Sequence, residues 1–215
     1  MAPEIVPSAF PEELSHGDYD DAPQYCVATC TAKAVEVYEK LVAQDPEDPP
    51  DLVIGADTIV VLASPSPASD SYTILEKPGN EADQVGMLTD MSGSSVDIVT
   101  AVTIVQPQIA TPGYSLSSLV TTTNVVFAEN SNEVIQAYVR SKEGIDRLDW
   151  LFLLSAPRHR SFSVDRAGGF AIQGLGGMLV KEIHGDYNNC VGFPAQAFFA
   201  WLAELAEEGV LCEID

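Results

Sequence analysis

An aspartate interrupts an apolar run that otherwise has the composition of a buried strand. The run is DLVIGADTIVVL, residues 51–62, and Asp57 follows the small residues Gly55 and Ala56. A carboxylate in a buried strand is costly unless a cation, a metal ion or hydrogen-bond donors face it. Small neighbours leave room for a ligand or another backbone segment to approach. Asp57 is therefore either a functional carboxylate that faces a ligand, or a core aspartate bonded to Thr58 or to backbone amides.

A lysine follows this strand after one predicted hairpin. Lys77 precedes Pro78 in ILEKP, residues 74–78. The proline favours extended geometry at the lysine, as at the end of a strand. Alone, such a pair indicates only a solvated turn. If the two strands pair, however, Lys77 lies beside Asp57 and becomes a candidate for binding an anion.

A glycine-rich segment, DRAGGFAIQGLGGMLV, is the third candidate. It spans residues 165–180, and we expect its glycines to leave backbone amides open to a phosphate or a base. Gln173 donates and accepts hydrogen bonds, so it can read the edge of a base or bridge two strands. The segment matches neither the GxxxxGK[ST] phosphate loop nor a GxGxxG turn before a helix.

Composition limits the classes of function. The 215 residues are 46% hydrophobic and carry a formal net charge of −22, which is typical of a globular domain and argues against nucleic-acid binding. No apolar run reaches the length of a membrane span, and the first residues lack the pattern of a secretory signal. The cations that precede Arg140 are Lys33, Lys40 and Lys77. An anion bound by the first two-thirds of the chain must therefore meet lysines or a metal ion.

The cysteines indicate buried thiols rather than a disulfide scaffold or a zinc site. Cys26 and Cys30 share a helical face, whereas Cys190 and Cys212 lie far away in the sequence. No further His or Cys near Cys26 and Cys30 completes a zinc ligand set. Thiols of this kind favour a reducing compartment.

Periodicity predicts helices and strands that alternate along the chain, hence an α/β or mixed α+β fold. The segments 95–107 and 114–128 are predicted to form one long hairpin. Predicted helices span 22–43, 81–91 after an Asn80 cap, a segment from Asn130 or Ser131 to about Val139, and 194–209. The other predicted strands are 51–62, 72–78 and a glycine-punctuated strand or strand pair within 170–187.

Five motifs in this order resemble the Maf (septum-formation-type) family of nucleoside triphosphate pyrophosphatases. They are VIGADTIV (53–60), ILEKP (74–78), MSG with VTAV (91–93 and 99–102), the glycine-rich segment, and HGDYNNCVGFP (184–194). IVPSAFPEEL (5–14) and TCTAKAVEV (29–37) resemble the family's early acidic loop and lysine-bearing helix. The resemblance, which extends from Glu4 to Leu205, implies a single domain over 1–215 with two lobes around a central cleft. Its fold would be a curved mixed β-sheet flanked by helices, similar to inosine triphosphatase.

The resemblance also implies roles for individual residues. Asp57 would be the catalytic carboxylate that activates water or binds Mg²⁺ or Mn²⁺. Lys33 and Lys77 would bind phosphates. Glu12 would be a second acidic residue of the site and a metal ligand, with Glu13 competing for that role. Gln173 and Gly174 would lie against the nucleotide.

The reaction implied is hydrolysis of a (d)NTP to the monophosphate and pyrophosphate, by a cytoplasmic house-cleaning enzyme. The expected substrates are dTTP, UTP or modified pyrimidine nucleotides. The alternatives are a 7-methyl-GTP pyrophosphatase and a catalytically impaired nucleotide-binding or regulatory member. Nucleic acid and membrane are not expected partners, and a homodimer is left open.

Two departures from the family pattern affect these expectations. The family's first strand and its Ser-x-Ser-Pro-Arg-Arg turn have no counterpart in the printed sequence, so a sheet edge would be unpaired and activity weak. Residues 148–164 form an apolar and basic block that we interpret as an insertion, because Asp-Arg precedes it at 146–147 and recurs at 165–166. Within it LLSAPRHR, residues 153–160, resembles the missing turn and is a candidate substitute.

Overall fold

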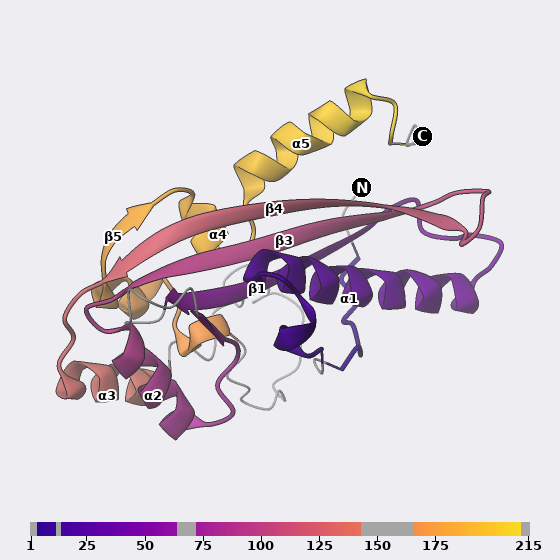
Figure 1. Cartoon of the computed structure of the whole chain (residues 1–215). Helices are drawn as coiled ribbons and strands as arrows, with labels where there is room; N and C mark the ends of the chain where they lie inside the picture. Colours follow the sequence, from indigo (N-terminus) through magenta and orange to yellow (C-terminus); the bar gives the residue numbers. More distant parts are fainter. Residues whose placement is uncertain (1–3, 12–13, 64–71, 143–165, 212–215) are drawn as a thin grey trace. The chain divides into compact units, whose positions relative to one another are not determined.

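Figure 1 shows the computed structural model, which describes residues 4–11, 14–63, 72–142 and 166–211. Strands in this part of the chain form a sheet in the order β2-β1-β3-β4-β5. They are β1 (Val53–Ala63), β2 (Tyr72–Leu75), β3 (Ser95–Pro107), β4 (Tyr114–Phe127) and β5 (Val180–His184). The α-helices are α1 (Ala22–Gln44), α2 (Glu81–Met91), α3 (Asn132–Ser141), α4 (Tyr187–Val191) and α5 (Ala195–Glu207). The predicted mixed α/β class is confirmed, as is the hairpin of β3 and β4.

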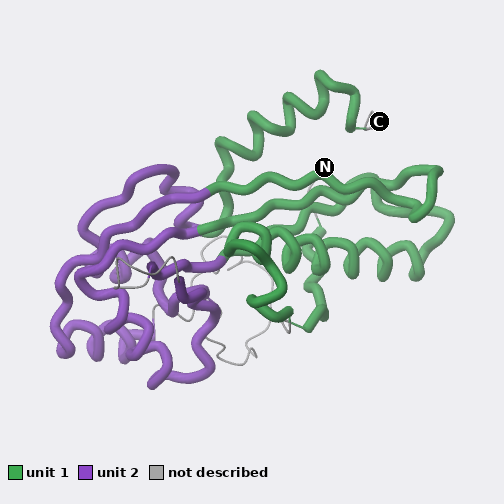
Figure 2. Tube along the Cα trace, viewed as in Figure 1, with its two compact units in different colours: residues 1–58, 99–121, 192–215 green, residues 59–98, 122–191 purple. Residues whose placement is uncertain are grey.

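The chain divides into two compact units, which Figure 2 shows in different colours. The first unit comprises Met1–Thr58, Val99–Thr121 and Gly192–Asp215, and the second comprises Ile59–Ile98 and Thr122–Val191. By their bounds, β1, β3 and β4 each contribute residues to both units. The single domain with a central cleft stays a prediction.

In the first unit, helices pack against strand β3 from opposite faces. Successive side chains of a strand point to opposite faces, so Val105 packs with α1 whereas Val102 and Ile104 pack with α5. The core with α1 contains Ala34, Val37, Tyr38, Val53 and Val105; the core with α5 contains Val102, Ile104, Phe198 and Leu205. Because both faces of β3 are buried, its sequence is a near-continuous apolar run and does not alternate between apolar and polar residues.

Helix α1 begins where its sequence provides a cap. The Asp21 side chain accepts a hydrogen bond from the Gln24 amide at 2.8 Å, and Pro23 lies in the first turn, where it sacrifices no helical hydrogen bond. The helix extends to Gln44, so the predicted span of 22–43 is confirmed. No helix in the described ranges is long and apolar enough to cross a membrane.

In the second unit, helices α2 and α3 cover a shared core. Asn80 caps α2 by accepting from the amides of Ala82 and Asp83. Ser131, rather than Asn130, caps α3. The core includes Leu88, Met91, Ile135, Tyr138, Val139, Phe127 and Phe170. Both helices therefore begin at side chains that satisfy their first amide groups.

The expectation for residues 170–187 was wrong in its first half. A 3₁₀ turn, η3 (Gly174–Leu179), precedes β5, so the strand begins only at Val180. Gly174 has a φ of +71°, in the left-handed region that favours glycine. A Cβ on Gly176 would lie 1.8 Å from the Ala171 carbonyl oxygen. The glycines therefore build a tight turn. The predicted insertion, 148–164, lies outside the described residues.

Candidate active site

Strand β1 and helix α1 approach so closely that only glycine fits between them. A Cβ on Gly55 would lie 2.8 Å from the Ala34 Cβ and 3.4 Å from the Cys30 carbonyl oxygen. Asp57 is two residues after Gly55 and so lies on the same face of the strand. Lys33 directly precedes Ala34 on the helix. The close approach therefore brings the lysine and the aspartate together.

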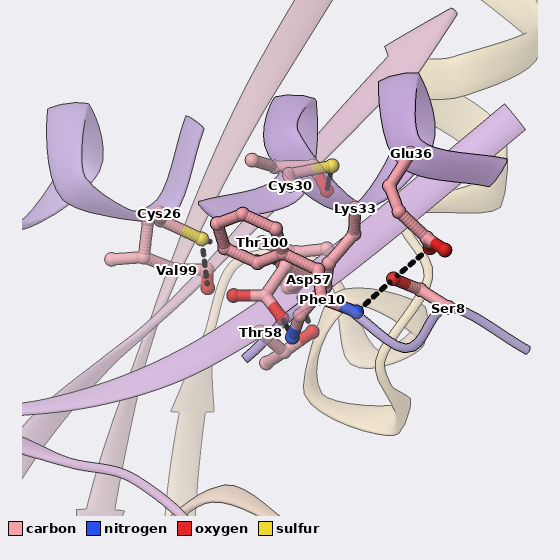
Figure 3. A network of polar contacts seen from close by, with 11 residues as sticks. Ser8, Phe10, Cys26, Cys30, Lys33, Glu36, Asp57, Thr58, Val99 and Thr100 are labelled. Carbon is pink, nitrogen blue, oxygen red and sulfur yellow. Dashed lines mark hydrogen bonds and ion pairs between the residues drawn. The ribbon is translucent and has the colours of Figure 1, made fainter. Parts of the chain in front are cut away.

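Lys33 and Asp57 form an ion pair, shown in Figure 3. The Lys33 Nζ lies 2.7 Å from the Asp57 Oδ1, and the two side chains are 19% and 15% exposed. A mostly buried carboxylate is tolerated when an opposite charge also donates a hydrogen bond to it. The ion pair with Lys33 therefore explains why a carboxylate is tolerated at Asp57 in this strand. Thr58, the other suggested partner, instead bonds the Thr100 hydroxyl at 3.0 Å.

Two buried thiols attach α1 to the backbone around this ion pair. The Cys26 Sγ donates to the Asp57 carbonyl at 3.4 Å, and the Cys30 Sγ donates to the Ala101 carbonyl at 3.3 Å. Burial raises the pKa of both thiols. Cys26 and Cys30 are therefore neutral packing residues, as predicted. Burial also raises the pKa of Cys190, in the second unit, to about 11.

Glu36 holds the N-terminal segment against α1, one turn after Lys33. Its Oε2 accepts from the Ser8 hydroxyl at 2.8 Å and from the Ala9 amide at 3.1 Å, and Figure 3 shows the bond from Ser8. The Phe10 amide donates to the Ser8 Oγ at 3.0 Å. Sequence reasoning missed Glu36, although its spacing of three from Lys33 places both residues on neighbouring positions of the helix surface. Glu12 and Glu13 lie outside the described residues.

In the second unit, the first glycines of the glycine-rich segment pack beside the end of β2. The Gly168 amide donates to the Glu76 carbonyl, and the Gly169 amide to the Arg166 carbonyl, both at 3.0 Å. Both glycines have a φ of +68°, and a Cβ on Gly169 would lie 2.8 Å from the Gln84 Cγ. The expectation that the glycines leave their amides open was therefore wrong for Gly168 and Gly169. The bond from Gly168 instead fixes the segment beside Glu76, which directly precedes Lys77.

Gln173 has an arginine as its neighbour. The Arg166 Nη1 donates to the Gln173 Oε1 at 3.4 Å, and both residues are half-buried. Sequence reasoning missed Arg166, although it lies in the same glycine-rich segment. The second unit thus contains Lys77, Arg166, Gln173 and Gly174, whereas the first contains Lys33 and Asp57. The predicted common cleft for Asp57, Lys77 and Gln173 stays a prediction.

The described side chains around Asp57 suit a metal ion that is held largely by water and substrate. Among the described residues, no three His, Cys, Asp or Glu side chains are grouped so that they could hold a metal ion. A protein cage of the zinc or calcium type is therefore not formed by this part of the chain. Mg²⁺, in contrast, is commonly held by one or two carboxylates together with water and substrate phosphates. Asp57 fits that mode.

Comparison with known proteins identifies the family of this chain. Residues 1–205 match the family described as Maf-like protein, and the chain belongs to this family. It is 35% identical over 211 residues to the dTTP/UTP pyrophosphatase of Schizosaccharomyces pombe, covering 96% of this chain and 76% of that protein. The Thermococcus kodakarensis dTTP/UTP pyrophosphatase is 32% identical over 193 residues, with 90% and 80% covered.

A human relative carries the same region within a longer protein. This is the probable bifunctional dTTP/UTP pyrophosphatase/methyltransferase protein, 36% identical over 206 residues, which are 94% of this chain and 28% of the relative. The family predicted from the five motifs is thus confirmed.

The contact at Gly55 gives a stability prediction. Gly55→Ala is expected to lower the free energy of unfolding by about 1–3 kcal/mol, because a new methyl group must push α1 away from β1. Gly86→Ala is the matched control, since nothing lies within 4 Å of a Cβ at this position in α2. The control should raise stability by about 0.4–1 kcal/mol. Urea unfolding measures both, and equal effects of the two substitutions would contradict the proposed packing.

Proposed function

We propose that this chain hydrolyses nucleoside triphosphates to the monophosphate and pyrophosphate, with dTTP, UTP or modified pyrimidine nucleotides as preferred substrates. Its relatives named dTTP/UTP pyrophosphatase support this substrate class. The structural observation that carries the proposal is the 2.7 Å pair of Lys33 and Asp57. It supplies a carboxylate and a cation on regular elements, and phosphoryl transfer depends mainly on such positioning and electrostatics.

Each residue has a distinct role in this proposal. Asp57 accepts a proton from the attacking water or holds the metal ion, and Glu12 is the second acidic residue. Lys33 and Lys77 donate to phosphate oxygens and so stabilise the charge that develops on the leaving pyrophosphate. A divalent ion, Mg²⁺ or Mn²⁺, would neutralise part of the triphosphate charge when bound. The chain has a formal net charge of −22, so this neutralisation also lowers repulsion between protein and substrate.

Other parts of the proposal concern the setting of the enzyme. Cys26, Cys30 and Cys190 are free thiols, which supports a reducing and hence cytoplasmic location. Formation of a homodimer and the absence of nucleic-acid and membrane partners stay predictions.

A substrate panel tests the proposed activity. Pyrophosphate release is measured from dTTP, UTP, CTP, ATP, GTP and 7-methyl-GTP, with Mg²⁺ and with Mn²⁺. The proposal expects the highest kcat/KM for dTTP and UTP. A maximum with 7-methyl-GTP supports the alternative pyrophosphatase, and binding without hydrolysis supports a catalytically impaired member. Absence of both binding and hydrolysis would overturn the nucleotide assignment.

The lysines can be separated by substitution. Lys33→Ala and Lys77→Ala are each expected to lower kcat/KM by about 10- to 100-fold, the value of one charge-assisted hydrogen bond to a phosphate. Lys40→Ala is the control, because Lys40 is exposed on the same helix as Lys33. Steady-state kinetics with UTP measure all three variants. A loss in Lys40→Ala equal to that in Lys33→Ala would show that the assignment on α1 is wrong.

A further inference from the structure

We propose that Arg166 sets base specificity by fixing the orientation of the Gln173 side-chain amide. The inference rests on the proposed function, since it takes Gln173 as a residue that faces the base. It adds a positioning residue to the site and names the chemical feature that the site selects, which is a carbonyl oxygen on the pyrimidine ring.

The orientation follows from the chemistry of the pair. A guanidinium group has donors and no acceptor, so only the amide oxygen of Gln173 can face Arg166. The Arg166 Nη1 lies 3.4 Å from this oxygen, a long hydrogen bond that still excludes the reversed amide, because the reversed amide would place two donors face to face. With its oxygen held, Gln173 presents its NH₂ group away from the arginine. That group is then directed to donate rather than to accept.

Arg166 and Gln173 each directly precede a tight 3₁₀ turn. The backbone after Arg166 is fixed by the Gly168–Glu76 bond, and the Gln84 Nε2 donates to the Gly169 carbonyl at 2.6 Å. Gln84 is itself 1% exposed.

On the other side of the pair, the Ala171 amide donates to the Tyr138 hydroxyl at 2.9 Å, two residues before Gln173. Gly176, three residues after Gln173, packs against the Ala171 carbonyl too closely to accept a Cβ. The backbones of Arg166 and Gln173 are therefore held in place, and a change at the Arg166 side chain acts mainly on the amide of Gln173.

A fixed NH₂ group discriminates between pyrimidines. Uracil and thymine present a carbonyl oxygen at position 4, which accepts a hydrogen bond, whereas cytosine presents an amino group there, which donates one. The Gln173 NH₂ group can donate to the carbonyl oxygen of uracil or thymine, whereas it would face the amino group of cytosine as a second donor. If the amide rotated by half a turn, its oxygen would accept from cytosine instead. Holding the amide in one orientation thus selects uracil and thymine nucleotides over cytosine nucleotides.

The test compares UTP with CTP, and UMP with CMP, in the full chain. Arg166→Met is expected to reduce the UTP/CTP ratio of kcat/KM about tenfold, through KM, with kcat for UTP largely kept. The UMP/CMP ratio of affinities measured by calorimetry should fall by a similar factor. Arg166→Lys retains a donor and should retain most of both ratios. Gln173→Glu, which offers only acceptors, should shift both ratios towards cytosine.

Arg140→Met is the matched control for charge and folding. Arg140 is exposed on α3 and its Nε donates to the Gln136 carbonyl at 3.0 Å, so its removal costs the same charge without changing either ratio. Unchanged ratios in Arg166→Met would overturn the inference while leaving the pyrophosphatase proposal intact. If the wild-type chain released no pyrophosphate, the proposed activity would fail, and the UMP/CMP affinities would still decide the role of Arg166.

Discussion

Replacing Asp57 by asparagine is expected to lower kcat for pyrophosphate release by about a thousandfold or more, the range for loss of a general base or of a metal-binding carboxylate. An amide neither accepts a proton at neutral pH nor binds a divalent cation strongly. Its oxygen can still accept from the Lys33 Nζ, which lies 2.7 Å from the present carboxylate. The folded state should therefore persist while activity is lost.

Steady-state kinetics and urea unfolding together measure this effect. Asp51→Asn is the control, because Asp51 is exposed just before β1 and its substitution removes the same charge. Turnover at the wild-type rate by Asp57→Asn would refute the assignment of Asp57. Equal losses in both variants would point to the general charge of the chain instead.

Adding a family-type first strand with its Ser-x-Ser-Pro-Arg-Arg turn before Glu4 is expected to raise kcat/KM at least a hundredfold. No arginine precedes Arg140 in these 215 residues. Two added contacts to phosphates, at about 1.5–3 kcal/mol each, correspond to roughly 10²- to 10⁴-fold in rate. β2 pairs with Val60–Ala63, and the first half of β1 extends beyond that ladder, which is where we expect the added strand to pair.

Pyrophosphate release from UTP measures the gain, and the same extension with both arginines replaced by alanine is the control. This control should be stabilised by the added strand, but its kcat/KM should rise little. Robust activity of the 215-residue chain without the extension would contradict this prediction. Arg158 and Arg160, which lie outside the described residues, would then be the next residues to substitute.

Sequence patterns predicted the elements well where local signals were strong. Apolar periodicity predicted α1 over 22–43, and the Asn80 cap predicted the start of α2. Between Phe170 and Val180 the same reasoning failed, because a turn built from left-handed and tightly packed glycines has no period of its own. Strand signals in this segment belong only to β5, which begins at Val180.

Candidate residues were easier to name than to connect. Motif resemblance named Lys33 and Asp57 separately, one for phosphate and one for metal or water. Their mutual contact depends on how closely α1 packs on β1 at Gly55, which is a tertiary property. Arg166 was missed for a similar reason. The direction of a glutamine amide depends on its neighbours in space, and the sequence alone does not specify them.

The placement of Lys33 and Asp57 on a helix and a strand has an entropic consequence for binding. Ordering a lysine side chain costs about 1.5–2 kcal/mol in lost rotamer freedom. Here much of that loss occurs on folding, because the ion pair already restrains Lys33 at a side-chain exposure of 19%. A nucleotide phosphate that takes over the hydrogen bond from the Lys33 Nζ would meet a lysine side chain that is already partly ordered. Binding at Lys33 and Asp57 should therefore cost less side-chain entropy than binding at a site built on mobile loops.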